Sequence, residues 1–220
     1  GEFACINDTS KYVVIPNGLS FEVTPRFNEL SKHKVALIVA RLDESSKRLS
    51  LALRIWARVK QDSVARDWTL RIVGHGNDLK LYEQIIQDKN IPDVSLEGRR
   101  DPFPYYEEAS IFLMTSRSES WGLTLTEAQQ MGVVPIAFDT YASIREIITD
   151  GEKGLVIMEG DMDSYVYRMK ELMSDSMLWQ RMAKKAIIST QRFSRERIAE
   201  MWWELLSEKK NIKPSLDRYD

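Results

Sequence analysis

Cysteine and histidine are scarce in this chain of 220 residues, which has one cysteine, Cys5, and two histidines, His33 and His75. A single cysteine excludes an intramolecular disulfide and any cysteine-based zinc cluster. Two histidines leave few ligands for a transition metal. We therefore expect a protein with no metal site and no cofactor that works in a reducing compartment.

An excess of either sign of charge is also missing. The sequence has 31 lysines and arginines against 33 aspartates and glutamates, a net charge of −2 at pH 7. No overall field attracts nucleic acid or an anionic membrane surface. We expect no nucleic-acid partner, and any phosphate-binding site has to be built locally.

Long hydrophobic runs are absent too. The longest, Val35–Ala40 and Val133–Phe138, are far shorter than the ~20 residues that span a bilayer. No signal-peptide pattern opens the chain, and residues 1–3 resemble a cloning remnant. The sequence predicts a cytoplasmic protein, or one at the cytoplasmic face of a membrane.

Short apolar runs typical of strands alternate with amphipathic stretches typical of helices. The six runs are Val35–Ala40, Thr69–Val73, Val94–Leu96, Ile111–Thr115, Val134–Phe138 and Leu155–Met158. They lack the alternation of half-solvated strands, so both faces of the sheet should be covered. This pattern predicts an α/β fold with a doubly wound, six-stranded parallel sheet of the Rossmann-like kind, which binds ligands at the carboxyl ends of its strands.

The two ends of the chain differ from this alternating middle. The start has one apolar run, Tyr12–Ile15, which predicts a linker with a single strand. The end is purely helical, and its last helix, Ser194–Lys209, is apolar over a wide arc that includes Trp202 and Trp203. We expect a linker at 4–30, a Rossmann-like α/β domain at 31–190 and a C-terminal helical segment at 191–220.

Two glutamates stand at E-x7-E spacing across a predicted strand-to-helix turn. Glu119 lies in the loop and Glu127 about one turn into the helix, while free amides near Gly122 and Leu123 face an anion. Carboxylates suit vicinal hydroxyls. The alternative is structural: Thr124-x-x-Glu127 is also a capping box, and Glu119 is then a plain loop charge.

Two cations flank the end of the first predicted strand. Arg41 ends it and Lys47 stands six residues on. A guanidinium and an ammonium so placed neutralise a diphosphate without metal. The alternative is that Arg41 pairs with Asp43 or Glu44 and that Lys47 is solvated.

Other strand ends carry weaker signals. Val73–Gly76 forms a tight Gly-His-Gly turn without the third glycine of a dinucleotide fingerprint, and Gly98-Arg99 ends the third run similarly. The sequence has no Walker-type phosphate loop, no Gly-x-Ser-x-Gly elbow and no His-Glu-x-x-His helix, which excludes the common nucleotide hydrolases, serine hydrolases and zinc proteases.

Together these motifs resemble the C-terminal, donor-binding half of a family 4 retaining glycosyltransferase with the GT-B fold. The resemblance covers nearly the whole chain and implies that the domain at 31–190 binds a nucleotide sugar. In chain order it is carried by Ile15–Gly18, Ala40–Leu42, Lys47-Arg48, Ile72–Gly76, Gly98-Arg99, Tyr105-Tyr106, Ala109, Glu119–Ala128, Gly132, Pro135, Asp150-Gly151 and Gly154-Leu155. Two departures stand out: Ser120-Trp121 replaces a common Gly-Phe, and Thr140–Ser143 lacks a glycine pair.

The resemblance implies roles for individual residues. Glu119 would bind hydroxyls of the donor sugar, and Arg41 and Lys47 would hold the diphosphate; these three are the expected catalytic residues. Glu127 would bind the ribose. The remaining donor-binding residues implied are Trp121, Gly122, Leu123, Gly74 and Arg99, the last of which would border the base.

The resemblance further implies a metal-independent, retaining transfer from a UDP- or GDP-linked sugar to a glycan or lipid acceptor, as in polysaccharide or lipopolysaccharide biosynthesis. The acceptor site would belong to a missing N-terminal domain, to which the last helix would cross back. This fragment would then bind donor without efficient transfer, and peripheral membrane association would concern the full-length enzyme only. The alternatives are a sugar-nucleotide epimerase of the same fold and a non-enzymatic α/β binding module.

Overall fold

A six-stranded parallel sheet forms the centre of the computed structural model, which describes residues 13–22 and 32–210. The strand order is β3-β2-β1-β4-β5-β6, so the direction of winding reverses between β1 and β4. The strands are β1 (Val35–Val39), β2 (Thr69–Val73), β3 (Val94–Gly98), β4 (Ile111–Met114), β5 (Val134–Asp139) and β6 (Leu155–Met158). The predicted Rossmann-like sheet, all six strands included, is confirmed.

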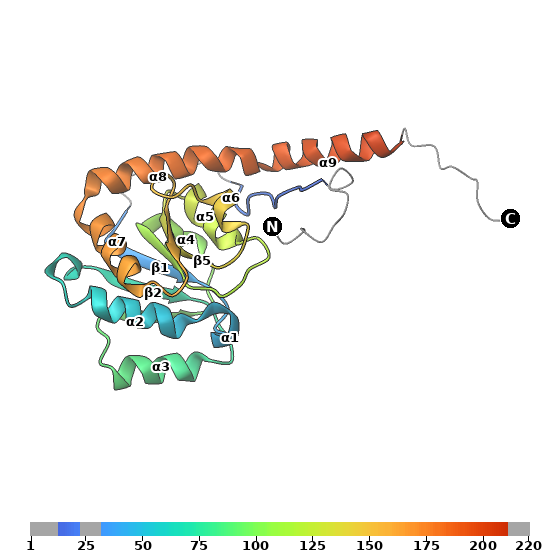
Figure 1. The fold of residues 1–220 in the computed structure, drawn as a ribbon. Helices are drawn as coiled ribbons and strands as arrows, with labels where there is room; N and C mark the ends of the chain where they lie inside the picture. Colours follow the sequence, from blue (N-terminus) through green and yellow to red (C-terminus); the bar gives the residue numbers. More distant parts are fainter. Residues whose placement is uncertain (1–12, 23–31, 211–220) are drawn as a thin grey trace.

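Helices cover both faces of the sheet (Figure 1). One face carries α2 (Leu49–Val59), α3 (Leu79–Asp88) and α7 (Met162–Ser174), and the other carries α4 (Phe103–Glu108), α5 (Leu123–Gln130) and α6 (Ile144–Ile147). Alternate strand residues point to opposite faces, so Leu113 joins one core and Phe112 the other. Burial on both faces explains why β1, β4 and β5 read as nearly continuous apolar runs, whereas β3, at the edge of the sheet, is only partly buried and contains Ser95 and Glu97.

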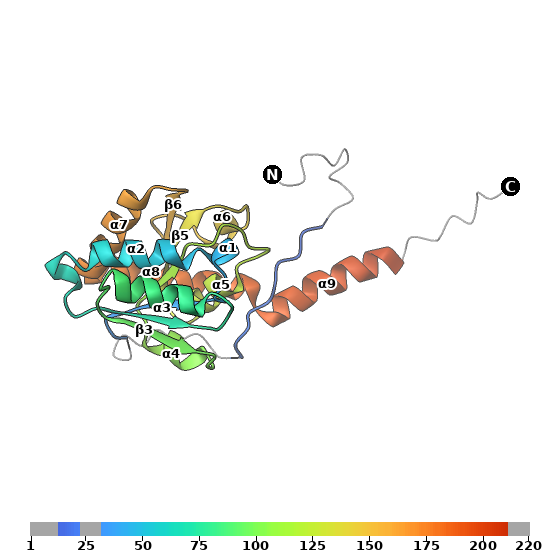
Figure 2. The same cartoon turned by 90° about the horizontal axis from the view of Figure 1, so that it is seen from below.

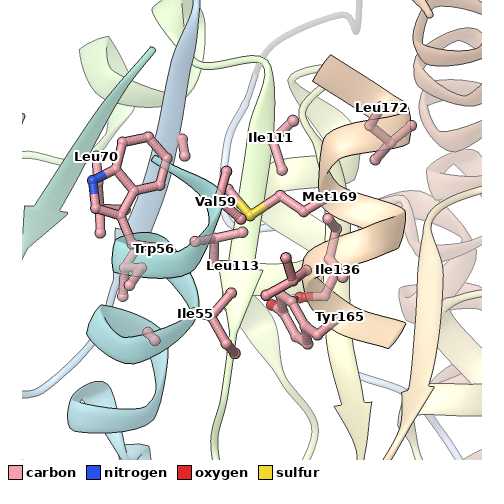
Figure 3. Packing of buried hydrophobic residues seen from close by; sticks show 14 of the residues in the cluster. Ile55, Trp56, Val59, Leu70, Ile111, Leu113, Ile136, Tyr165, Met169 and Leu172 are labelled. Carbon is pink, nitrogen blue, oxygen red and sulfur yellow. The ribbon is translucent and has the colours of Figure 1, made fainter. Parts of the chain in front are cut away.

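The larger core lies between the sheet and α2 and α7 (Figure 3). Trp56 from α2 and Tyr165 from α7 are fully buried there against strand residues such as Ile136. The Tyr165 hydroxyl donates to the Ile136 carbonyl at 2.7 Å, so its polar atom is satisfied. Burial of each such large side chain contributes roughly 1.5–3 kcal/mol to folding. This core fixes the positions of the strands whose carboxyl ends carry the loops described below.

Two long helices end the described chain. Helix α8 (Ser176–Thr190) packs on α5, and after the short turn η4 (Gln191–Phe193) helix α9 (Arg195–Lys210) projects away from the body (Figures 1 and 2). The additional C-terminal helices predicted from the sequence are confirmed. Trp203 on α9 is 70% exposed.

Residues 18–20 lie against the junction of α8 and α9. The Leu19 amide donates to the Phe193 carbonyl at 2.9 Å, and the Arg195 guanidinium donates to the Ser20 carbonyl and to Glu22. The strand predicted at Tyr12–Ile15 is wrong over its described part, residues 13–15. These residues lead into the helix junction rather than to an open edge of the sheet.

Three segments lie outside the described residues: 1–12, 23–31 and 211–220. They contain Cys5, the suspected cloning remnant at 1–3 and most of the predicted linker at 4–30. Four short elements complete the fold: α1 (Glu44–Lys47), η3 (Ser63–Ala65), α6 and η4.

Candidate functional site

The reversal of strand order leaves a cleft at the carboxyl ends of β1 and β4. Its volume is about 380 Å³. Most of its walls come from the loops that follow these two strands and from the start of α5. The lining residues are Asn17, Val39, Ala40, Arg41, Lys47, Glu119, Ser120, Trp121, Gly122, Leu123 and Thr124. A crevice at this point of a doubly wound sheet is where such folds bind ligands.

A very short helix, α1, fixes the loop after β1. Asp43 caps it by accepting from the Ser45 amide at 3.1 Å, and Arg48 ends it in the left-handed conformation with φ 50°. Hydrogen bonds from Ser45 and Ser46 and the nearby charge of Arg41 hold the pKa of Asp43 below its usual value. The cap and the left-handed turn bring Lys47 back over the strand end.

The loop after β4 is bonded directly to this helix. The Thr115 hydroxyl donates to the Lys47 carbonyl at 3.0 Å, and the Arg117 amide donates to the Ser46 carbonyl at 2.7 Å. The Arg48 guanidinium donates to the Thr115 carbonyl at 2.8 Å. Arg48 and Thr115 are therefore supporting residues that local spacing does not reveal, because their contacts join segments more than sixty residues apart.

Lys47 and Glu119 meet in the cleft. The Lys47 ammonium lies 2.5 Å from Glu119 Oε1, and their side chains are only 18% and 17% exposed. The Ser116 hydroxyl donates to the same carboxylate oxygen at 2.7 Å. The interpretation of Lys47 as a solvated charge is wrong, and so is that of Glu119 as a plain loop charge.

Arg41 occupies the outer part of the cleft. Its side chain is 69% exposed, and it donates to Asp43 Oδ2 at 3.0 Å. The alternative in which Arg41 pairs with Asp43 is therefore correct. An exposed pair of this kind is weak, about 0–1 kcal/mol, so an anion in the cleft competes readily for the guanidinium.

The N-terminus of α5 forms the opposite wall. Gly122 caps the helix with φ 93°, and a Cβ there would lie 2.7 Å from the Tyr141 hydroxyl oxygen. The proposed capping box is wrong, because Thr124 lies inside the helix rather than at its cap. The first amides of α5, at Leu123 and Thr124, have no partner within the helix, and both residues line the cleft.

The segment after β5 supports this wall. The Thr140 hydroxyl donates to the Ser116 carbonyl at 2.8 Å, and the Ser143 hydroxyl donates to the Trp121 carbonyl at 3.0 Å. Both residues lie in the segment 140–143, where the expected glycine pair is missing, and neither was predicted to have a role. Two hydroxyl residues after a buried strand were the only signal available.

Glu127 lies one helical turn beyond the cleft lining, on the same face of α5 as Thr124. Its Oε2 accepts a hydrogen bond from the Tyr106 hydroxyl at 2.9 Å. Burial, together with the charge of Glu127, raises the pKa of Tyr106 well above its usual value, so the phenol stays protonated and remains the donor. Glu127 therefore has a defined partner outside its own helix.

Gly74 and Arg99 do not line the cleft. Gly74 has φ 148°, and a Cβ there would lie 1.8 Å from the Ala40 carbonyl oxygen. It supports the β1 loop from behind, where the Leu42 amide also donates to the His75 carbonyl at 2.9 Å. Arg99 is exposed in the turn after β3.

Within residues 13–22 and 32–210, no group of three or more histidine, cysteine, aspartate or glutamate side chains is placed to hold a metal ion. Among the same residues, no helix combines the length and apolar character needed to cross a bilayer.

Known proteins resemble this chain over most of its length. Residues 21–188 match the family model of glycosyl transferases group 1. An exopolysaccharide phosphotransferase of Streptomyces coelicolor is 28% identical over 90% of this chain and 21% of its own. A poly(glycerol-phosphate) alpha-glucosyltransferase of Bacillus subtilis is 28% identical over 80% of this chain and 26% of its own.

Solved structures share the fold. A variant of S. aureus TarM, in complex with UDP and other ligands, superposes with a TM-score of 0.73 at 23% identity, covering 88% of this chain and 38% of that one. The chain thus spans between a fifth and two fifths of the length of these three proteins.

Proposed function

The chain belongs to the family of group 1 glycosyl transferases, and from this premise we propose that it is the donor-binding half of an enzyme that transfers a sugar from a nucleotide-diphosphate sugar. The donor occupies the cleft between the loops after β1 and β4. The observation that carries this proposal is the meeting of Lys47 and Glu119 across that cleft.

The charges of the cleft fit the two polar parts of such a donor. Lys47, Arg41 and the first amides of α5 offer positive charge and N–H donors to a diphosphate. Glu119 offers carboxylate oxygens to the hydroxyls of the sugar. Glu127, one turn farther along α5, receives the ribose, and the turn that carries Arg99 borders the base.

The proposed reaction proceeds with retention of configuration. The bond between the anomeric carbon and the phosphate oxygen breaks, the acceptor oxygen bonds to the same face of that carbon, and the acceptor proton passes to the departing diphosphate. Negative charge develops on that diphosphate, where preorganised cations such as Arg41 and Lys47 are worth several kcal/mol. These groups carry the stabilisation in our proposal, and we expect donor binding to persist without divalent cations.

The acceptor would bind to a part of the enzyme beyond this chain. The relatives are several times longer, and the segment 13–22 and helix α9 leave the body at the same junction (Figure 2). We infer that this junction leads to the acceptor-binding domain, that the acceptor is a glycan or lipid in polysaccharide or lipopolysaccharide synthesis, and that the work is done in the cytoplasm or at its membrane face. The isolated chain would bind donor without efficient transfer.

Calorimetric titration tests the proposal. UDP and GDP are titrated separately into the chain in EDTA, with UDP first because the TarM complex contains it. We expect saturable binding of one nucleotide, weakened about tenfold or more by Lys47→Ala through loss of a charge-assisted contact. The matched control is Lys34→Ala, which removes an exposed, ion-paired lysine beside the opposite end of β1 and should leave binding unchanged.

Equal binding by both lysine variants would contradict the cleft as the diphosphate site. Absence of nucleotide binding would favour the alternative of a non-enzymatic binding module. An epimerase of the same fold would convert the donor sugar without any acceptor. Incubation of the chain with the sugar nucleotide alone therefore tests this alternative, since an epimerised sugar would favour it over the transferase.

A further inference from the structure

The side chain of Glu127 accepts a hydrogen bond from the hydroxyl of Tyr106, which comes from another helix. Tyr106 lies on α4, is fully buried, and donates to Glu127 Oε2 on α5 at 2.9 Å. The same hydroxyl lies 3.4 Å from the Thr124 carbonyl. A phenol has one proton to donate, and the shorter contact to a charged acceptor takes it.

The position of this hydroxyl is fixed by packing. The Tyr106 ring lies 6.0 Å from the Phe112 ring and 5.8 Å from the Phe21 ring, measured between centroids. The Lys32 ammonium donates to the Tyr106 carbonyl at 2.7 Å and ties down the backbone of the same residue. A hydroxyl on a rigid, buried ring is a stationary anchor for a flexible carboxylate.

The anchor occupies one oxygen of Glu127 and leaves the other free to bind a ligand. A free glutamate side chain loses rotamer entropy when it is held in one position. Because the hydrogen bond from Tyr106 orders the Glu127 carboxylate before a ligand binds, less entropy is lost when the carboxylate accepts hydrogen bonds from a pair of neighbouring hydroxyls.

We propose that Tyr106 is a positioning residue that orients Glu127 toward the 2′- and 3′-hydroxyls of the donor ribose and so sets a preference for ribonucleotides over deoxyribonucleotides. This inference rests on the proposed function, since it takes Glu127 as the ribose-binding group. It adds Tyr106 to the proposed donor site, together with a preference for ribose over deoxyribose.

The test is Tyr106→Phe, which removes the hydroxyl and keeps the ring. Calorimetric titration compares the nucleoside diphosphate that binds with its 2′-deoxy and 3′-deoxy forms. We expect the variant to bind the ribonucleotide about tenfold more weakly, the size of one lost charge-assisted hydrogen bond. Its affinity for the deoxy forms should hardly change, so the preference for ribose shrinks by the same factor.

The matched control is Tyr105→Phe. Tyr105 is the neighbour on α4, and its hydroxyl donates to a different carboxylate, Glu97, at 3.1 Å. This variant should keep the full ribose preference. A double variant, Tyr106→Phe with Glu127→Ala, should show the same preference as Glu127→Ala alone, which separates an effect through Glu127 from a general loss of packing.

Each outcome bears on one of the two proposals. If the wild-type chain prefers the ribonucleotide and Tyr106→Phe keeps that preference, the role of Tyr106 is overturned while the donor site stands. If the wild-type chain binds ribo and deoxy forms equally, the role is overturned as well. If no nucleotide binds, the donor-site proposal itself fails, and this inference falls with it.

Discussion

The cleft loops and helix α9 both present side chains suited to binding another molecule. The loops are fixed by hydrogen bonds to other parts of the chain, whereas most of α9 has no such contacts in the described structure. The loops at 40–48 and 115–122 are joined to each other and to the segment after β5 by hydrogen bonds from Thr115, Arg117 and Thr140. Helix α9 leaves the body after its first turns (Figure 1), with Ile198 buried and Trp202 and Trp203 exposed.

The difference indicates two kinds of binding surface: a preorganised cleft for a small ligand, and an apolar helix face suited to contact with another protein domain. Polar groups in the cleft keep their positions through bonds made within the chain, which lowers the entropy cost of binding a ligand. Apolar rings on α9 have no such support in the described structure, and large exposed aromatic side chains on one helix mark an interaction surface. Substitutions in the cleft loops measure how rigidly those loops are held, and substitutions on α9 measure how little the fold depends on that helix.

The largest expected effect comes from Gly74→Ala. The new methyl group would stand 1.8 Å from the Ala40 carbonyl oxygen, in a backbone conformation with φ 148°. We expect a loss of about 4 kcal/mol or more in the free energy of unfolding, measured by urea denaturation. Gly160→Ala is the control, because it has φ 82° but nothing within 4 Å of the added methyl group, and should cost only about 1–2 kcal/mol. Equal losses in the free energy of unfolding for the two variants would show that the loop after β1 moves readily to accommodate the added methyl group.

A pH effect of intermediate size should come from Lys32, which supports α4 behind the cleft. Burial lowers its pKa to about 7, against a smaller opposing effect of Glu107. Between pH 7 and the ordinary lysine pKa of 10.5, the unfolded chain holds a proton that the folded chain has released, so stability rises with pH. We expect a rise of about 2 kcal/mol between pH 7 and pH 9 that is absent in Lys32→Met. If the free energy of unfolding depends on pH in the same way for the wild type and Lys32→Met, the ammonium of Lys32 is not buried.

A smaller loss of stability is expected from Lys47→Met. The substitution leaves the Glu119 carboxylate, 17% exposed, without its cation, which should cost about 1–2 kcal/mol. Lys34→Met removes a pair whose side chains are 58% and 68% exposed and should cost less than about 0.5 kcal/mol. Thermal unfolding of both variants measures the contrast, and a reversed order would mean that the cleft pair is no better held than the surface pair.

The smallest effect is expected on α9. Trp203→Ala should change the free energy of unfolding by less than about 0.5 kcal/mol because the ring is 70% exposed. Ile198→Ala, at the buried start of the same helix, should cost about 2 kcal/mol. A large loss from Trp203→Ala would place that ring in the fold of this chain rather than at a surface for another body.

The sheet was predictable because β1, β4, β5 and β6 are short, mainly apolar runs, and β2 and β3 keep enough apolar residues to be recognised beside them. The parallel order followed from the missing alternation. The strand at Tyr12–Ile15 failed because β-propensity alone does not tell whether a sheet edge is available, and residues 13–15 lead to the helix junction instead. The four-residue helix α1 was missed because its start depends on a single cap, Asp43.

The candidate site was predictable as a set of strand-end residues but not as a geometry. Local spacing put Lys47 and Glu119 at strand ends, whereas their ion pair depends on the strand order that makes β1 and β4 neighbours. The bond from Tyr106 to Glu127 joins two helices twenty-one positions apart, beyond any local pattern. Thr124 was misread as a cap because the conformation of Gly122 decides where α5 begins.

Hydrogen–deuterium exchange with and without a saturating nucleoside diphosphate tests whether the cleft between the loops after β1 and β4 is the donor site. If the cleft binds the donor, amides in residues 41–48 and 116–125 become protected while those of α9 exchange at the same rate as before. Protection confined to α9, or to the far end of the sheet near α7, would contradict the account, as would a saturable ligand that protects neither loop.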